Sequence, residues 1–172
     1  MLPKIRRILY ATDLSPNSGY VLRYAVNSAK QHGAKLVLLH VMEEIPPTTK
    51  ALVESHVDRE TLAKMGADSY SYVHERLKKQ IEVLCEKEKL AEPKSNEIFD
   101  SIKITQGHAA TKILELADEL DCDAIVMGTH GKGLLKYTFL GSTAKQVLRR
   151  TRRPIFVVPM PEGETDITFH DK

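Results

Sequence analysis

The sequence predicts an α/β fold: an open, doubly wound sheet of five parallel strands with helices on both faces. Short aliphatic runs alternate along the chain with longer segments of helical periodicity, in the order β-α-β-α-β-α-β-α-β. Two of the runs, residues 36–41 and 124–127, are apolar almost throughout, which is typical of strands buried on both faces of a parallel sheet. Because parallel strands are joined by right-handed crossovers, this alternation places helices on both faces of the sheet.

The composition is that of one globular domain. Of 172 residues, 42% are hydrophobic and 28% are charged. The formal net charge of +2 gives no strong field for nucleic acid or a membrane surface, and no apolar run approaches the roughly 20 residues of a membrane span. The N-terminus has no signal-peptide pattern, and Cys85 and Cys122 make neither a disulfide nor a metal-site pattern. We therefore expect a cytoplasmic protein without nucleic-acid or membrane partners, in which residues 1–160 form a single domain and residues 161–172 a polar C-terminal tail.

The first 41 residues predict a β-α-β unit. Residues 4–10 are rich in β-forming residues and predict the first strand. Ser15 and Pro16 then predict a helix start, with Ser15 as N-cap and Pro16 at the first helical position. Apolar residues recur at helical spacing from position 21 to position 29, and Gly33 ends the helix. Residues 35–41 are the second strand.

Residues 43–90 are long for a crossover between parallel strands. Pro46 and Pro47 predict a loop at residues 43–49. We expect a short helix near residues 50–64 and a longer amphipathic helix near residues 68–90, which are either interrupted at Gly66 or run together through it. The loop and helical insertion at residues 43–67 either covers the site, joins a subunit contact or is a solvated helical extension.

The C-terminal half continues the alternation. Residues 98–105 alternate apolar and polar side chains, which predicts a half-exposed edge strand. A helix over residues 109–120 leads into the fourth strand at 124–128, and residues 155–158, framed by two prolines, form the last strand. The arginines between positions 149 and 153 either form a nucleic-acid patch or complement the dipole of the preceding helix. We expect the acidic, polar tail from residue 160 onward to be loosely held.

Glycines follow the fourth strand and lead into a helix. They are Gly128, Gly131 and Gly133, followed by Gly141 directly before Ser142 and Thr143. Glycines allow close approach of backbone N–H groups, and the unpaired N–H groups at a helix start carry partial positive charge, so this arrangement favours phosphate binding. The spacing is neither the dinucleotide fingerprint nor a Walker A loop. The alternative is a plain strand-to-helix connection in which Ser142 caps the helix.

Asp13 ends the first strand. In open α/β sheets, ligands bind at the carboxyl edge where the strand order reverses, so Asp13 is a candidate to accept hydrogen bonds from a nucleoside. The alternative is a loop aspartate that helps to cap the following helix.

The glycine spacing G-x2-G-x9-G-[S/T], filled by Gly128, Gly131, Gly141 and Ser142, resembles the phosphate- and ribose-binding motif of the universal stress protein family, in its ATP-binding branch. Four strands resemble those of the family as well: residues 8–13, 36–41, 121–128 and 153–159. The resemblance implies strand order 3-2-1-4-5, in the adenine nucleotide alpha hydrolase-like fold, which brings Asp13 next to Gly128. It also implies a homodimer formed through the last strand, Ile155–Val158.

The resemblance further implies a nucleotide site. Equivalents of Asp13 and Val41 hold the adenine end, and Lys132 neutralises phosphate charge. The complete set of expected nucleotide-binding residues is Ala11, Thr12, Asp13, Val41, Met127, Gly128, His130, Gly131, Lys132, Gly133, Gly141, Ser142 and Thr143. No catalytic residue or metal ligand is assigned.

Three functions are consistent with these features. The first is a dimeric regulatory or stress-response protein that binds ATP or another adenine nucleotide, with Mg²⁺ or Mn²⁺ carried on the phosphates rather than by a dedicated carboxylate set. The second is a slow ATPase or nucleotidyl-transfer enzyme on the same scaffold. The third is a nucleotide-free interaction module that acts through a protein partner, although the presence of every motif glycine argues against it.

Overall fold

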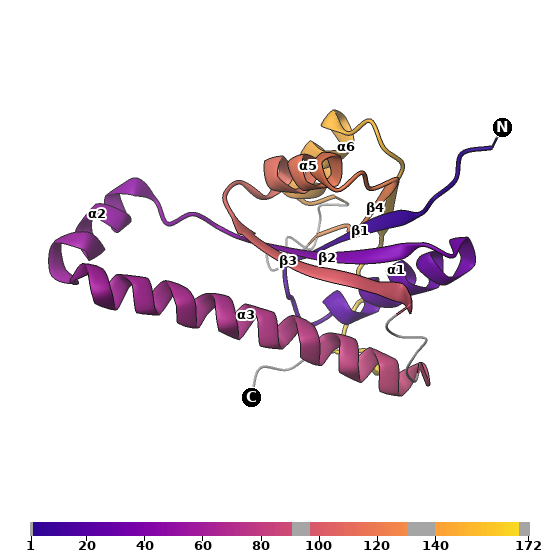
Figure 1. Cartoon of the computed structure of the whole chain (residues 1–172), viewed down its shortest axis with the longest axis horizontal. Coiled ribbons are helices and arrows are strands. Elements are labelled where there is room, and N and C mark those ends of the chain that lie inside the picture. The colour runs from indigo at the N-terminus through magenta and orange to yellow at the C-terminus, as the bar shows by residue number, and fades with distance from the viewer. Residues whose placement is uncertain (1, 91–96, 131–139, 169–172) are drawn as a thin grey trace.

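The computed structural model describes residues 2–90, 97–130 and 140–168. Its helices and strands alternate as expected (Figure 1). In chain order they are β1 (Arg7–Thr12), α1 (Ser18–His32), β2 (Lys35–Met42), α2 (Pro47–His56), α3 (Arg59–Lys87), β3 (Phe99–Gln106), α5 (Ala109–Glu119), β4 (Ala124–Gly128), α6 (Ser142–Arg150) and β5 (Ile155–Val158).

The strands form one five-stranded sheet in the order β3-β2-β1-β4-β5, and every pairing is parallel. This confirms the predicted fold class and strand order. In the central strand, Ala11 pairs with Leu39 of β2 on one side and with Met127 of β4 on the other. Since the chain leaves β1 toward β2 and returns through β4, the carboxyl ends of β1 and β4 flank the point where the strand order reverses.

The core lies in two layers, one on each face of the sheet (Figure 1). One layer packs α1 and α3 against the sheet and includes Tyr10, Leu22 and Leu77. The other packs α5 and α6 against the opposite face and includes Ile113 and Val147. Successive residues of β1 point into alternate layers, so a strand buried on both faces must be apolar throughout.

The predicted cap of the first helix is wrong. Helix α1 begins at Ser18 with Asn17 at the N-cap, and Ser15 instead accepts the Ser18 N–H at its carbonyl oxygen, at 2.9 Å. The reason lies in the residues just before it. Leu14 adopts a left-handed conformation with φ of 58°, and the Asp13 carboxylate accepts the Ser15 N–H, so residues 13–15 form a turn rather than the first turn of the helix.

Of the two alternatives at Gly66, the structure shows the continuous helix, and the break between the helices of the insertion lies before it. Helix α3 runs without interruption through Gly66, and the break falls at Val57 and Asp58. The Asp58 carboxylate accepts hydrogen bonds from both the N–H and the hydroxyl of Thr61, which caps α3. A glycine inside a helix costs only about 1 kcal/mol, so Gly66 weakens this helix without ending it.

The C-terminal segment is docked rather than loosely held, at least as far as residue 168. Ile167 is buried and belongs to the core layer under α1. The Asn17 side chain donates to the carbonyl oxygen of Gly163 at 2.9 Å, and Arg23 forms two hydrogen bonds with the carboxylate of Asp166. The polar composition of the tail concealed this apolar anchor, which the partly buried Met160 supplements.

The two edges of the sheet differ. Strand β3 forms one edge and is half-buried, as predicted. Strand β5 forms the other edge, where Phe156 is half exposed. Within the described ranges, each helix is too short or too polar to cross a bilayer.

Candidate functional site

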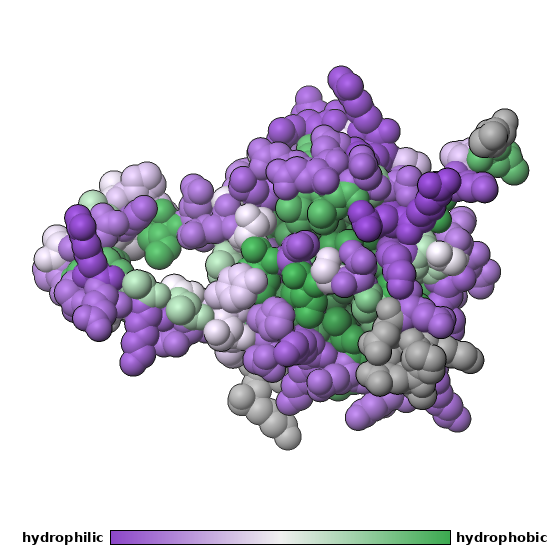
Figure 2. All heavy atoms as spheres, in the orientation of Figure 1, coloured by the Kyte–Doolittle hydropathy of each residue, from purple (hydrophilic) through white to green (hydrophobic). Residues whose placement is uncertain are grey.

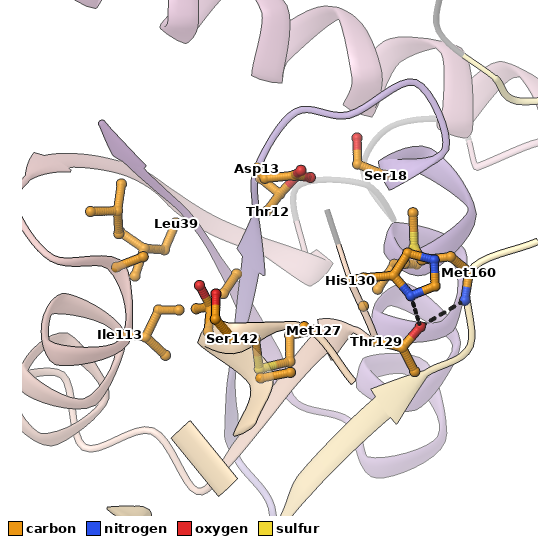
Figure 3. A pocket seen from close by; sticks show the side chains of 18 of the residues that line it. Thr12, Asp13, Ser18, Leu39, Ile113, Met127, Thr129, His130, Ser142 and Met160 are labelled. Atoms are coloured by element: carbon orange, nitrogen blue, oxygen red, sulfur yellow. Dashed lines mark hydrogen bonds between the residues drawn. The ribbon is translucent and has the colours of Figure 1, made fainter. Parts of the chain in front are cut away.

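A cavity of about 950 Å³ opens at the carboxyl ends of β1, β2 and β4 (Figure 3). It contains every predicted site residue that the structure describes, and it therefore brings together segments more than a hundred positions apart. These residues are Ala11, Thr12, Asp13, Val41, Met127, Gly128, His130, Gly141, Ser142 and Thr143. The predicted residues Gly131, Lys132 and Gly133 lie outside the described residues.

Asp13 forms one wall of the cavity. Its Oδ1 accepts the Ser15 N–H at 3.1 Å, and Thr12 Oγ1 accepts the Leu14 N–H at 3.1 Å, so two consecutive side chains fold the backbone sharply after β1. This bond belongs to a turn and lies three residues before α1, so Asp13 does not cap the helix. The other carboxylate oxygen, Oδ2, is buried and has no hydrogen-bond partner among residues 2–90, 97–130 and 140–168. Because a buried acceptor without a partner is costly, this oxygen is a candidate to accept a hydrogen bond from a ligand in the cavity.

His40 supports the same wall. Its Nδ1 lies 2.8 Å from the carbonyl oxygen of Thr12, and the side chain is buried. A carbonyl oxygen can only accept, so Nδ1 carries a proton and donates it to Thr12. From the sequence, His40 is only one member of a buried strand. Its place in the site follows from its register opposite Thr12, which a single sequence does not reveal.

The opposite wall is the turn after β4. The Thr129 N–H donates to the Val158 carbonyl oxygen at 2.9 Å, and the Gly141 N–H donates to the Thr129 carbonyl oxygen at 2.7 Å. The Thr129 hydroxyl accepts the Met160 N–H at 3.1 Å and lies 3.0 Å from Nδ1 of His130 (Figure 3). These bonds hold the two ends of the glycine loop together beside the cavity.

Gly141 permits this close approach. A Cβ at this position would lie 3.3 Å from the Thr129 carbonyl oxygen and 3.3 Å from the His130 Cα, both of them backbone atoms. Gly141 is also the N-cap of α6, and no side chain caps this helix. The alternative in which Ser142 is the cap is therefore wrong, since Ser142 is the first helical residue.

The N-terminus of α6 faces the cavity, which Ser142, Thr143 and Ala144 line. The first N–H groups of a helix have no intrahelical acceptor and carry partial positive charge, so this end of the cavity favours an anion. The Lys145 side chain lines the same region. The cavity is therefore polarised, with positive charge at α6 and a carboxylate at Asp13.

Apolar side chains from three elements, and Met160 after β5, complete the cavity. Leu39 and Val41 come from β2, Met127 from β4 and Ile113 from α5. Met160 closes one side: a Cβ on Gly128 would lie 2.8 Å from its sulfur. Sequence reasoning missed Leu39, Ile113 and Met160, because an apolar residue that lines a cavity has the same pattern as one in the core.

The site offers hydrogen bonds and charge rather than a metal centre. In residues 2–90, 97–130 and 140–168, no three or more His, Cys, Asp or Glu side chains gather in a metal-binding group. What the geometry can do is hold an elongated, amphipathic anion, with its anionic end at α6 and its donor groups at Asp13.

Comparison with known proteins identifies the family. A sequence model of the universal stress protein family matches residues 4–159. The chain belongs to this family. This universal stress protein is 29% identical over 160 residues to universal stress protein MJ0531 of Methanocaldococcus jannaschii, an alignment that covers 92% of this chain and 85% of its relative.

Solved universal stress proteins share the fold. UspA from Lactobacillus plantarum superposes with a TM-score of 0.69 at 19% identity, covering 91% of this chain and 99% of UspA. A universal stress protein in complex with cAMP has a TM-score of 0.58 at 19% identity, covering 92% of this chain and the whole of the other. One from Archaeoglobus fulgidus in complex with dAMP has a TM-score of 0.53 at 17% identity, covering 93% and 100%.

Proposed function

We propose that this universal stress protein binds ATP or another adenine nucleotide and acts as a regulatory, stress-response protein. One observation carries the proposal: the cavity combines the N-terminus of α6, which no side chain caps, with a buried Asp13 oxygen that has no donor among the described residues. A nucleotide meets both requirements, since it has phosphates at one end and hydroxyl and amino donors at the other.

In the proposed complex, the phosphates lie against the β4–α6 loop. Gly128, His130 and Gly141 present backbone there, and Ser142 and Thr143 offer both N–H and hydroxyl groups. Lys145 of α6, together with Lys132 of the β4–α6 loop, neutralises phosphate charge. A divalent ion, Mg²⁺ or Mn²⁺, accompanies the phosphates without a carboxylate set of its own.

The nucleoside end lies between Asp13 and the apolar wall. The Asp13 carboxylate accepts a hydrogen bond from the sugar or base, while Val41 contributes an apolar surface and backbone groups. Ala11, Thr12 and Met127 complete this end of the site. The complexes of two family members with cAMP and with dAMP support an adenine ligand.

We also propose that the protein is cytoplasmic and forms a homodimer through β5. Strand β5 is at the edge of the sheet and exposes Phe156. An exposed apolar edge strand is a template for pairing with another chain, so pairing of two copies along Ile155–Val158 removes the exposed edge.

Calorimetric titration with ATP and Mg²⁺ tests the nucleotide proposal, together with mass spectrometry of any nucleotide released from freshly purified protein. Gly141→Val should weaken binding at least about a hundredfold, because the added side chain meets the Thr129 and His130 backbone. Asp13→Asn keeps the turn bond at Oδ1 but loses the charge of the acceptor, which should weaken binding about ten- to hundredfold.

Gly66→Ala is the matched control, because it lies on α3 and nothing stands within 4 Å of its added Cβ. All three variants should keep the wild-type circular dichroism spectrum. The proposal fails if the stripped protein gives no heat with ATP, or if Gly141→Val binds ATP as the wild type does. Phosphate release in the same samples decides whether hydrolysis accompanies binding.

A further inference from the structure

Gln80 is the polar member of the buried stripe of α3. The buried residues of this helix are Val73, Leu77, Gln80 and Leu84, so the glutamine lies in an otherwise apolar row. Its side chain belongs to the inner half of α3, which packs against the domain, whereas the outer half extends into solvent with its mixed polar and apolar surface (Figure 2). Gln80 is only 1% exposed. A buried amide is costly unless its hydrogen bonds are satisfied, so packing alone favours an apolar residue at this position.

Gln80 binds the first residue of α1. Its Nε2 donates to Ser18 Oγ at 2.8 Å. Ser18 is fixed at two further atoms: its carbonyl oxygen accepts the Tyr10 hydroxyl at 2.7 Å, and its N–H donates to the Ser15 carbonyl oxygen at 2.9 Å. Ser18 also lines the cavity. The position of this cavity residue therefore depends on β1, on α3 and on the turn before α1.

The hydrogen bonds continue from Ser18 to the carboxylate of Asp13. The Ser15 N–H donates to Asp13 Oδ1 at 3.1 Å. What we call the Asp13 network consists of Gln80, Ser18, Ser15 and Asp13, and it runs from α3 to the wall of the cavity. In Figure 3 the Asp13 carboxylate points toward Ser18. Because each bond fixes the group that makes the next one, a side chain of α3 influences the orientation of this carboxylate.

Buried oxygens without a partner gather in the Asp13 network. Within the part of the chain that the structure describes, the buried side-chain atoms without a hydrogen-bond partner are Asp13 Oδ2, Ser15 Oγ and Gln80 Oε1. All of them belong to the network. Such atoms lower the stability of a fold, and departures of this kind are expected at functional sites. The cavity that the network borders therefore explains these polar residues better than the stability of the core does.

We propose that Gln80 is a positioning residue for the nucleotide site: through Ser18 it holds the Asp13 carboxylate in the orientation that binds the ligand. This inference rests on the function proposed above and adds a residue that acts without lining the cavity. Helix α3 also holds the turn at a second point, where Arg76 donates to the Leu14 carbonyl oxygen at 3.3 Å. A carboxylate that is already held loses less conformational freedom on binding, so this preorganisation raises affinity.

Titration calorimetry with ATP and Mg²⁺ on Gln80→Met tests the proposal. Methionine fills a similar space without a donor, so the stripe stays packed while the bond to Ser18 is lost. The affinity for ATP should fall about tenfold, which is the effect of one hydrogen bond. Ser18→Ala should cause a similar loss. Because both variants remove the same bond, the double variant should also lose about tenfold rather than about a hundredfold.

Leu84→Met is the matched control. It places the same side chain on the same buried stripe, one turn further along α3, and should bind ATP as the wild type does. Gln80→Met/Ser18→Ala removes both buried polar partners together, so its melting temperature should equal or exceed that of the wild type. Weaker binding without a loss of stability separates a positioning role from a structural one.

Hydrogen exchange measured by NMR without nucleotide separates this inference from the proposed function. The amides of Ser15 and Ser18 should exchange about tenfold faster in Gln80→Met than in the wild type, whereas the Leu9 amide in β1 should be unchanged. If the wild type gives no heat with ATP, the nucleotide proposal fails, and the two serine amides decide whether Gln80 holds the turn. The inference is overturned if these amides keep the wild-type rate in Gln80→Met, or if this variant binds ATP with wild-type affinity.

Discussion

Replacing Gly19 by alanine tests whether the C-terminal segment is an integral part of the domain. Gly19 lies in the first turn of α1, and a Cβ there would be 2.8 Å from the backbone carbonyl oxygen of Ile167. The Ile167 side chain is only 3% exposed and packs into the core layer under α1. A backbone atom cannot move aside without the whole segment, so alanine must displace it.

The magnitude follows from two opposing terms. Alanine in place of glycine stabilises a helix by about 0.5–1 kcal/mol. Overpacking a well-filled contact costs about 1–3 kcal/mol. The net expectation is a loss of about 1 kcal/mol, which lowers the Tm of a chain of this size by about 2–4 °C.

Scanning calorimetry and urea unfolding measure this loss. Gly66→Ala is again the control, because its Cβ meets open space and only the helix-stabilising term remains. Ile167→Ala should itself cost about 2–4 kcal/mol. If Ile167→Ala releases the segment, the carbonyl oxygen no longer blocks position 19. Adding Gly19→Ala should then raise the free energy of unfolding of the Ile167→Ala protein by about 0.5–1 kcal/mol. A Gly19→Ala protein that melts at or above the wild-type Tm would refute the docked segment.

Three further predictions concern other parts of the molecule. The Arg23 guanidinium lowers the pKa of Asp166, so the stability that this ion pair contributes is present above about pH 4 and is lost as the pH falls below that value. Proteolysis of the tail should therefore accelerate below about pH 4, and Asp166→Asn should show the same susceptibility at neutral pH. Leu77→Ala should lower the free energy of unfolding by about 2–5 kcal/mol, because Leu77 is fully buried. Leu52→Ala in dilute protein should change it by less than about 0.5 kcal/mol, because α2 has no buried residue, and equal losses would contradict this difference in packing. Burial raises the pKa of Cys122 to about 11, so a thiol reagent should label Cys122 only after unfolding, and rapid native labelling would contradict its burial.

Hydrophobic periodicity predicted which segments are strands and helices, and the family resemblance predicted the order of the strands in the sheet. The aliphatic runs of β1, β2 and β4 are apolar because both faces of these strands are buried, so their existence and approximate bounds could be read from sequence. Strand order could not, since alternation of strands and helices does not determine which strands become neighbours. The family resemblance predicted the strand order, and this order predicted that Asp13 lies next to Gly128.

The errors occurred where local rules compete. Ser15 and Pro16 are good helix-starting residues, but the turn at Asp13 and Leu14 delays the helix to Ser18. Val57 ends α2 in an extended conformation and Asp58 caps α3, whereas the modest penalty at Gly66 does not interrupt the helix. Site residues such as His40 depend on register across the sheet, which a single sequence does not contain.

The loop at residues 13–17 connects the cavity, α3 and the C-terminal segment. Asp13 lines the cavity, Arg76 of α3 donates to the Leu14 carbonyl oxygen at 3.3 Å, and Asn17 binds Gly163. Leu14 adopts a left-handed conformation that costs a non-glycine residue about 1 kcal/mol or more, so the loop depends on these contacts to keep its shape.

Coupling through such a loop must be reciprocal. A ligand that binds Asp13 more tightly in this loop conformation also favours the contacts that maintain it. For the proposed nucleotide, the factor by which release of the segment weakens binding must therefore equal the factor by which bound nucleotide shifts the docking equilibrium of the segment, and Asp166→Asn supplies the released state. Titration calorimetry and hydrogen exchange of residues 160–168 measure the two sides independently. A nucleotide affinity unchanged by release of the segment would show that the loop keeps its conformation through Arg76 and the Asp13 turn alone.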